Sequence, residues 1–133
     1  MRRGKSNRRR TSFLRITAAR DRTRTFLTAG VSAVLATLWL IDDLSTWLIV
    51  ERFCDALRQP HNENGSRWRK AQALRDASLS VRAMTVRDLL DHQDDAVSSV
   101  AREMAASGAL QDGDRPFAAP RHWASFVLVG AWM

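Results

Sequence analysis

The chain has 133 residues, with 21 Lys or Arg against 14 Asp or Glu, a formal net charge of +7. Residues 1–25 hold ten of the bases and one acid, so the body that follows is mildly acidic and gives no reason to expect a nucleic-acid partner. The single cysteine, Cys54, excludes a disulfide scaffold and a multi-cysteine zinc site. It is compatible with a reducing cytoplasm, where we expect the protein.

Residues 1–22 predict a disordered basic tail, because they combine many like charges with few apolar residues. Arg pairs there resemble a twin-arginine signal, but no apolar signal core follows. The uncharged run over residues 26–41 is shorter than the roughly 20 residues that a membrane span needs. The cations of the tail that could bind an anionic surface are Arg2, Arg3, Lys5, Arg8, Arg9 and Arg10.

The segment VSAVLATLWLIDD, residues 31–43, is the most informative part of the chain. A helical turn should precede it and end at Gly30, and its apolar run predicts a strand over 32–38. An apolar strand of this kind is typical of an α/β sheet with helices on both faces. The run ends in Asp42 and Asp43, at the carboxyl edge where ligands bind in such sheets. Either acid is also a good N-cap for the next helix.

Helical patterns follow over residues 43–57, after Ser66, after Thr85 and after Asp94. Thr85 and Asp88 have the spacing of a capping box, and Gly108 ends the last helix. Residues 126–129 (FVLV) predict a second buried strand. The fold class is therefore α/β, with two buried strands and about four helices. Two strands are too few for an independent sheet, which indicates part of a domain.

Three blocks of this sequence carry a family resemblance: FLTAGVSAVLATLWLIDD, then ERFCDAL with RKAQALRDA, then RPFAAPRHWASFVLVGAW. They resemble the C-terminal part of the CHAT domain, a caspase-like domain often found with tetratricopeptide repeats. The resemblance spans residues 23–132 and implies an incomplete caspase-like α/β sandwich. We accordingly divide the chain into the tail, 1–22, and a partial CHAT domain, 23–133.

Active relatives in that family resemble cysteine peptidases whose His and Cys precede the "AG" segment. No His precedes His61 here. The resemblance therefore implies that the catalytic dyad is absent and that the lone chain is not an enzyme. Cys54 stands where the family has Tyr and should be buried on an apolar helix face. The sequence predicts neither a metal site nor a cofactor.

The other histidines have structural interpretations. His61 should be a surface loop residue, His92 a partner of a helix C-terminus and His122 an aromatic replacement that packs. The resemblance places Trp39, Asp42 and Asp43 at a substrate pocket, where an acid could pair with a basic side chain. Alternatively, Asp43 only caps the helix and Asp42 is solvated.

These features favour a truncated CHAT-domain protein without peptidase activity of its own. It would be a remnant or a partner-completed half that acts in protein–protein interaction. The expected partners are the missing N-terminal half of a CHAT domain or a tetratricopeptide-repeat protein. The alternative is a small nucleic-acid-binding protein that acts through its Arg-rich tail. A third hypothesis is a peripheral membrane protein, bound by the tail and the apolar run.

Overall fold

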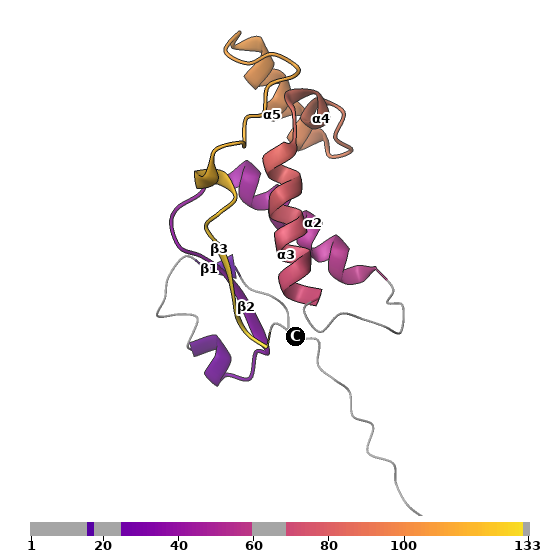
Figure 1. Ribbon diagram of the computed structural model, residues 1–133. Helices are drawn as coiled ribbons and strands as arrows, with labels where there is room; N and C mark the ends of the chain where they lie inside the picture. The colour runs from indigo at the N-terminus through magenta and orange to yellow at the C-terminus, as the bar shows by residue number, and fades with distance from the viewer. Residues whose placement is uncertain (1–15, 18–24, 60–68, 132–133) are drawn as a thin grey trace, which may run out of the picture.

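The apolar run forms β2 (Ala33–Thr37) in a computed structural model that describes residues 16–17, 25–59 and 69–131. β2 pairs in parallel with β1 (Ile16–Thr17) and antiparallel with β3 (Phe126–Gly130) (Figure 1). The antiparallel register places Leu35 opposite Leu128. With the helices described below, the sheet gives a mixed α/β fold, as the sequence predicts.

β1 lies inside the basic tail, for which the sequence predicts disorder. Ile16 and Thr17 nevertheless pair with Leu35 and Ala36, a short strand that the sequence does not predict. β1 depends on its pairing with a neighbouring strand, and this pairing cannot be predicted from the charge pattern of the tail. Residues 1–15 and 18–24 lie outside the described residues, and the prediction is not tested there.

Four helices follow β2: α2 (Asp43–Arg58), α3 (Arg69–Ala83), α4 (Val86–Leu90) and α5 (Asp95–Ala106). A helical turn at residues 25–28 precedes β2, and Gly30 ends it with a φ of 88°. The capping box of Thr85 and Asp88 is present, and Asp94 caps α5. A short 3₁₀ helix, η1 (Pro120–His122), leads into β3. The expected cap Ser66 lies outside the described residues.

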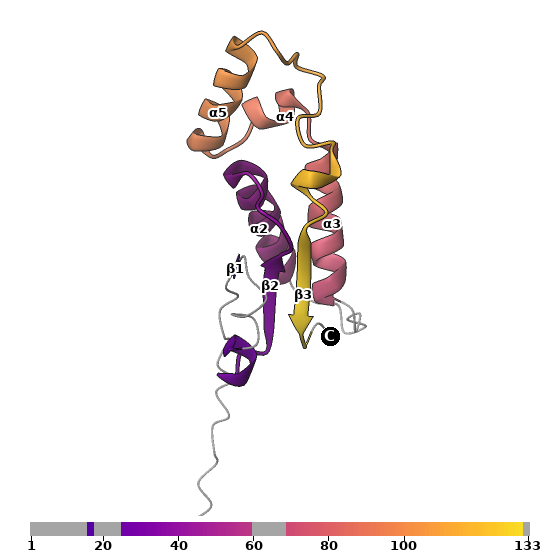
Figure 2. The same cartoon turned by 90° about the vertical axis from the view of Figure 1, so that its left-hand side faces the viewer.

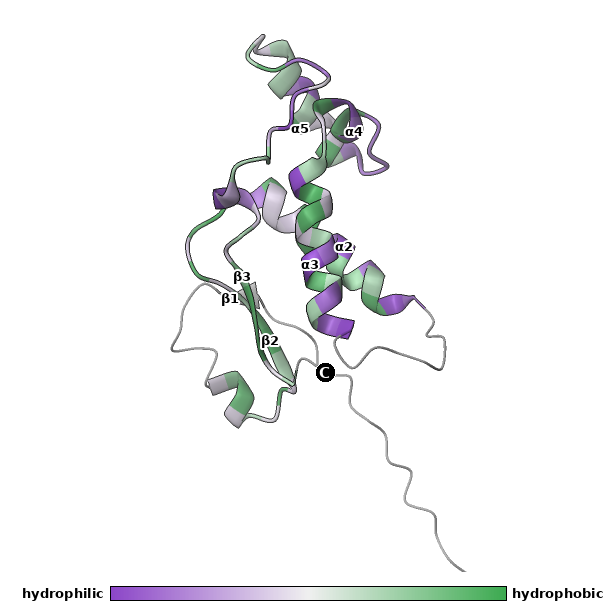
Figure 3. Cartoon of the chain, viewed as in Figure 1, coloured by the Kyte–Doolittle hydropathy of each residue, from purple (hydrophilic) through white to green (hydrophobic). Residues whose placement is uncertain are grey.

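One layer of helices, α2 and α3, packs against the sheet (Figure 2). Apolar residues occur along both helices and along β2 (Figure 3), and the buried ones form one core. Trp47 on α2 remains 40% exposed, so this helix is less buried than its wide apolar arc indicates. The shared core includes Leu35, Leu48, Ile49, Phe53, Leu74, Ala77, Val81 and Phe126.

The two faces of β3 differ in burial. Phe126 and Leu128 contact the helical core, whereas Val127 and Val129 alternate with them and face the other way. Val129 is 36% exposed, so β3 is not buried on both faces as its composition predicts. The reason is that, among the described residues, α2 and α3 supply a helical layer on one face only.

α4 and α5 form a lobe beyond the end of α3, away from the sheet (Figure 1). The buried residues of α5 are Val97, Ser98 and Ala101. The loop that returns from this lobe is held by backbone hydrogen bonds from Val86 and Arg87 to the carbonyls of Asp114 and Asp112. It also buries Phe117, which is 2% exposed.

Gly130→Ala should destabilise the fold more than Gly108→Ala. Both glycines have positive φ, 105° and 70°, so an alanine at either position costs about 1–2 kcal/mol of backbone strain. A Cβ at Gly130 would also lie 2.7 Å from the Ser32 carbonyl oxygen, whereas Gly108 has nothing within 4 Å. Urea unfolding followed by circular dichroism measures both losses. Equal losses would contradict this account of the β3 terminus.

Candidate functional site

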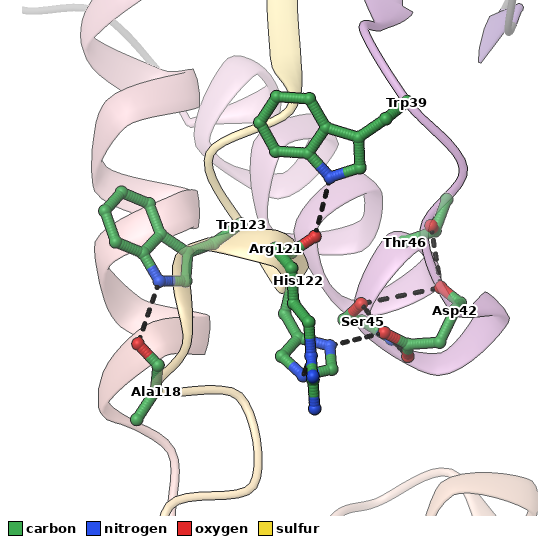
Figure 4. A network of polar contacts seen from close by, with 8 residues as sticks. All are labelled: Trp39, Asp42, Ser45, Thr46, Ala118, Arg121, His122 and Trp123. Atoms are coloured by element: carbon green, nitrogen blue, oxygen red, sulfur yellow. Dashed lines mark hydrogen bonds and ion pairs between the residues drawn. The ribbon is translucent and has the colours of Figure 1, made fainter.

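The site begins where β2 ends. Because β3 runs antiparallel to β2, the residues just before β3 lie beside the residues just after β2. The Leu38 N–H donates to the Ser125 carbonyl at 2.9 Å and extends the ladder by one pair. The indole N–H of Trp39 then donates to the carbonyl of Arg121, in η1, at 3.0 Å (Figure 4).

Asp42 is the N-cap of α2. Its Oδ1 accepts the Ser45 backbone N–H at 2.8 Å, and its Oδ2 accepts the Ser45 hydroxyl at 2.6 Å. Its carbonyl accepts the Thr46 hydroxyl at 2.8 Å. The bond from the Ser45 backbone satisfies a donor that the first turn of a helix otherwise leaves free, and the two hydroxyl bonds add to it.

A second bond ties Asp42 to η1. His122 Nδ1 lies 2.7 Å from Asp42 Oδ2, although the two residues are 80 positions apart (Figure 4). Arg121 Nε donates to His122 Nε2 at 3.1 Å, so Nε2 accepts and the network assigns the proton to Nδ1. The ring also packs edge-on against Phe117, with centroids 5.5 Å apart. We call the Asp42–His122 contact the clasp.

The pKa of the Asp42 carboxyl lies below its usual value of 3.8. Partial burial alone would raise this pKa. The hydrogen bonds from the Ser45 hydroxyl and backbone, and then the contact with His122, outweigh burial because they stabilise the charged carboxylate. Asp42 is therefore ionised at neutral pH and forms a charge-assisted clasp.

Ser45, Asp42 and His122 are the residue types of a serine-hydrolase triad. Their hydrogen bonds, however, follow a different order from those of a triad. The Ser45 hydroxyl donates to Asp42 and not to His122, and Ser45 is fully buried. In a triad, the histidine bonds the nucleophile and an exposed serine meets the substrate. The trio therefore fixes the start of α2 against η1 in an arrangement that differs from a triad.

The clasp leaves the neighbouring residues open to solvent. Leu38 and Trp39 are 55% and 42% exposed, and Leu40 is 89% exposed. Asp43, in the first turn of α2, is exposed and has no hydrogen bond or ion pair with any described residue. We call residues 38–43 the lip. It presents apolar side chains and one free carboxylate from a backbone that the clasp holds in place.

The structure reverses one of the two expectations for the acids, in which Asp43 caps the helix and Asp42 is solvated. Asp42 caps α2 and Asp43 is solvent-exposed, because the residue that precedes the first helical turn, and not the residue inside it, directs its side chain to the free N–H groups. The sequence predicts a packing role for His122 and does not reveal its bond to Asp42. The sequence feature that could have indicated this bond is the position of His122 shortly before β3, the antiparallel neighbour of β2.

Cys54 lies on α2, half-buried against the core. Neither histidine of the described residues is its partner. His92 Nδ1 accepts the Asp94 N–H at 3.1 Å, and its Nε2 lies 3.4 Å from Glu51. Both ring nitrogens of His92 are thus engaged, as are those of His122. His61 lies outside the described residues.

His92 differs from its predicted role at a helix C-terminus. α4 ends at Leu90, and only the backbone N–H of His92 bonds a helix carbonyl, that of Leu89 at 3.3 Å. The ring turns to α2 instead, where it contacts Glu51 and meets the edge of Trp47 at 5.8 Å. The side chain therefore joins the α4–α5 lobe to α2.

Three further observations concern the described part of the chain. No group of three His, Cys, Asp or Glu residues there could hold a metal ion. No helix in it has both the length and the apolar character to cross a bilayer. The tail cations Arg2, Arg3, Lys5, Arg8, Arg9 and Arg10 lie outside it.

Comparison with known proteins gives one match. A family model described as the CHAT domain matches residues 18–131, which is most of the chain. No curated protein and no solved structure matches.

Asp42→Asn should lower the free energy of unfolding at pH 7 by about 1 kcal/mol, because the clasp loses its charged acceptor while Asn still caps. The folded pKa of Asp42 lies below 3.8, so this contribution is present above that pH and disappears as the pH falls through the folded value. Unfolding curves of both proteins, recorded from pH 7 down to the lowest pH at which the chain stays folded, measure the change. The Asp43→Asn control should change stability by less than about 0.5 kcal/mol. A stability gap that keeps the same size throughout this pH series would refute the charged clasp.

Proposed function

The chain belongs to the CHAT domain family, which is caspase-like and peptidase-related, and on this basis we propose that it supplies the substrate-side lip of such a domain without cleaving peptides on its own. In this proposal the lip binds a peptide and the chemistry depends on groups outside the described residues. The observation that carries it is a solvent-exposed lip whose backbone is fixed at both ends, by Trp39 on Arg121 and by Asp42 on His122.

The absence of independent cleavage is supported by the partners of the two described histidines. Cysteine peptidases need a histidine within hydrogen-bond reach of the thiol, in order to form the thiolate. His92 and His122 use their ring nitrogens on Glu51, Asp94, Asp42 and Arg121. Cys54 packs against the core from an apolar helix. Neither described histidine therefore has a free ring nitrogen to act as a base for this thiol.

Peptide binding is supported by the chemistry of the lip. Leu38, Trp39 and Leu40 offer apolar surface, and the free carboxylate of Asp43 offers a partner for a basic side chain. An exposed group of large apolar residues is typical of interaction sites. Asp42 is unsuited to this task because its carboxylate is already bonded to Ser45 and His122. Of the pocket candidates, Trp39 and Asp43 are therefore our choice for ligand contact.

We also propose that the lip works with a complementary half of a caspase-like domain. The half-exposed second face of β3, with Val127 and Val129, would be covered by such a half. Covering apolar sheet surface is favourable by about 25 cal/mol per Å². The complementary half would bring the His and Cys that the family uses, from another segment or another chain.

The first test is turnover of fluorogenic peptides that carry Arg, Lys, Asp or Leu at the position before the reporter. We expect no signal above buffer from the wild-type chain, and the same result from Cys54→Ala. Release of the reporter by the wild-type chain but not by Cys54→Ala would overturn the proposal.

The second test is binding of a short arginine-containing peptide amide, followed by fluorescence anisotropy at low salt. Asp43→Asn should weaken binding about threefold, the typical effect of one exposed charge pair. Asp95→Asn is the matched control, because Asp95 is also the first residue of a helix that begins after an aspartate cap. Equal affinities of wild type and Asp43→Asn would contradict the role of Asp43.

A further inference from the structure

β3 has one unpaired edge. Ser125 and Ala131 bond to β2 through Leu38 and Ser32, so in an antiparallel ladder Val127 and Val129 also direct their backbone groups to β2. The alternate residues Phe126, Leu128 and Gly130 direct their N–H and C=O groups to the opposite side. None of the three has a hydrogen bond there. An open edge of this kind can accept an additional strand.

An apolar groove lies along this edge, between β3 and α3. Its volume is about 590 Å³, within the roughly 300–1,000 Å³ range of ligand pockets. Phe126 and Leu128 line it from the strand, and Leu79, which is 37% exposed, lines it from the helix. The lining is completed by Ala71, Leu74, Ser78, Trp123 and Ala124. Alternate side chains of an added strand would point into this groove.

Cations border the groove along its length. Lys70 Nζ donates to the Ala131 carbonyl at 2.7 Å, which places an ammonium at the end of β3. The guanidinium of Arg82 lies 5.2 Å from the centre of the Trp123 ring, at the start of β3. Arg75 lines the groove between them, with a side chain that is 73% exposed. The acid of α3, Asp76, is 3.8 Å from Arg75 and neutralises one charge at most.

We propose that this edge and groove bind an extended segment of a partner protein, apolar at alternate positions and acidic at both ends. The segment adds to β3 as a strand, and its backbone pairs with Phe126, Leu128 and Gly130. Its apolar side chains enter the groove, and its terminal acids meet Lys70 at one end and Arg82 at the other. This interaction is independent of the lip and of any peptidase chemistry.

Charge excludes a second copy of the chain as the occupant. In a two-fold pairing of β3 with β3, the end that carries Lys70 would meet the end of the other copy that carries Arg82. Both partners would then be basic, and like charges across an interface disfavour the pair. With an acidic segment, the carboxylates at its two ends would instead be attracted to Lys70 and Arg82.

The test uses the full chain and a labelled peptide, Glu-Val-Thr-Val-Thr-Val-Glu, in anisotropy titrations at physiological salt. Three valines face one side of the extended peptide and the glutamates occupy its ends. We expect saturable binding by the wild-type chain. Leu79→Asp and Arg75→Glu should each weaken it about fivefold or more. Their controls, Val100→Asp on α5 and Arg115→Glu in the returning loop, should leave it unchanged.

A second peptide separates strand addition from simple attraction to the basic tail. N-methylation of the backbone amides on the pairing edge keeps the charge and the side chains but removes the hydrogen-bond donors, so binding should fall at least tenfold. Undiminished binding of this peptide, or equal binding of a version with Lys ends, would overturn the proposal. So would a concentration-dependent dimer of the free chain that Leu79→Asp dissociates, because a second copy would then occupy the groove.

Discussion

Antiparallel pairing of β2 with β3 brings together the two segments on which the other features depend. Its register places the start of β3 beside the end of β2, and η1 therefore meets the cap of α2. The same register decides which backbone groups of β3 face β2 and which face the groove. A shift by one residue would exchange Leu128 with Val127 on the core face and remove Gly130 from its contact with Ser32. The core on one face of the sheet fixes this register.

In the clasp, one carboxylate both caps α2 and bonds to η1, which is distant in the sequence. Asp42 has two oxygens, and the Ser45 backbone occupies one while the Ser45 hydroxyl and His122 share the other. Because these donors are supplied by different elements, the start of α2 cannot move relative to η1 without the loss of a charge-assisted bond. The exposed lip thus lies between two fixed points, which limits the conformational entropy lost when a ligand binds it.

Local features of this fold could be predicted from the sequence, and non-local ones could not. The β2 strand, the capping box at Thr85 and the turn at Gly30 depend on neighbouring residues, and the structure contains all three. β1 and the bond between Asp42 and His122 depend on strand pairing between distant segments. Arg69 is a similar case, because its guanidinium donates to the Leu57 and Gln59 carbonyls at the end of α2. For the candidate site, the sequence indicates that Asp42 and Asp43 follow β2, whereas only the geometry shows which of them caps α2.

The lobe of α4 and α5 has a consequence for the motions of the chain. α5 contributes Val97, Ser98 and Ala101 to the interior, and Val97 and Ala101 join the same core as the larger apolar side chains of β2, α2 and α3. Segments with little buried apolar surface open at lower free energy than the rest of a domain. Amide hydrogens of α5 should therefore exchange with solvent while those of β2 remain protected. The lobe is tied to the rest of the chain by His92 near Glu51 and by Phe117 against His122, so its opening should also loosen the clasp.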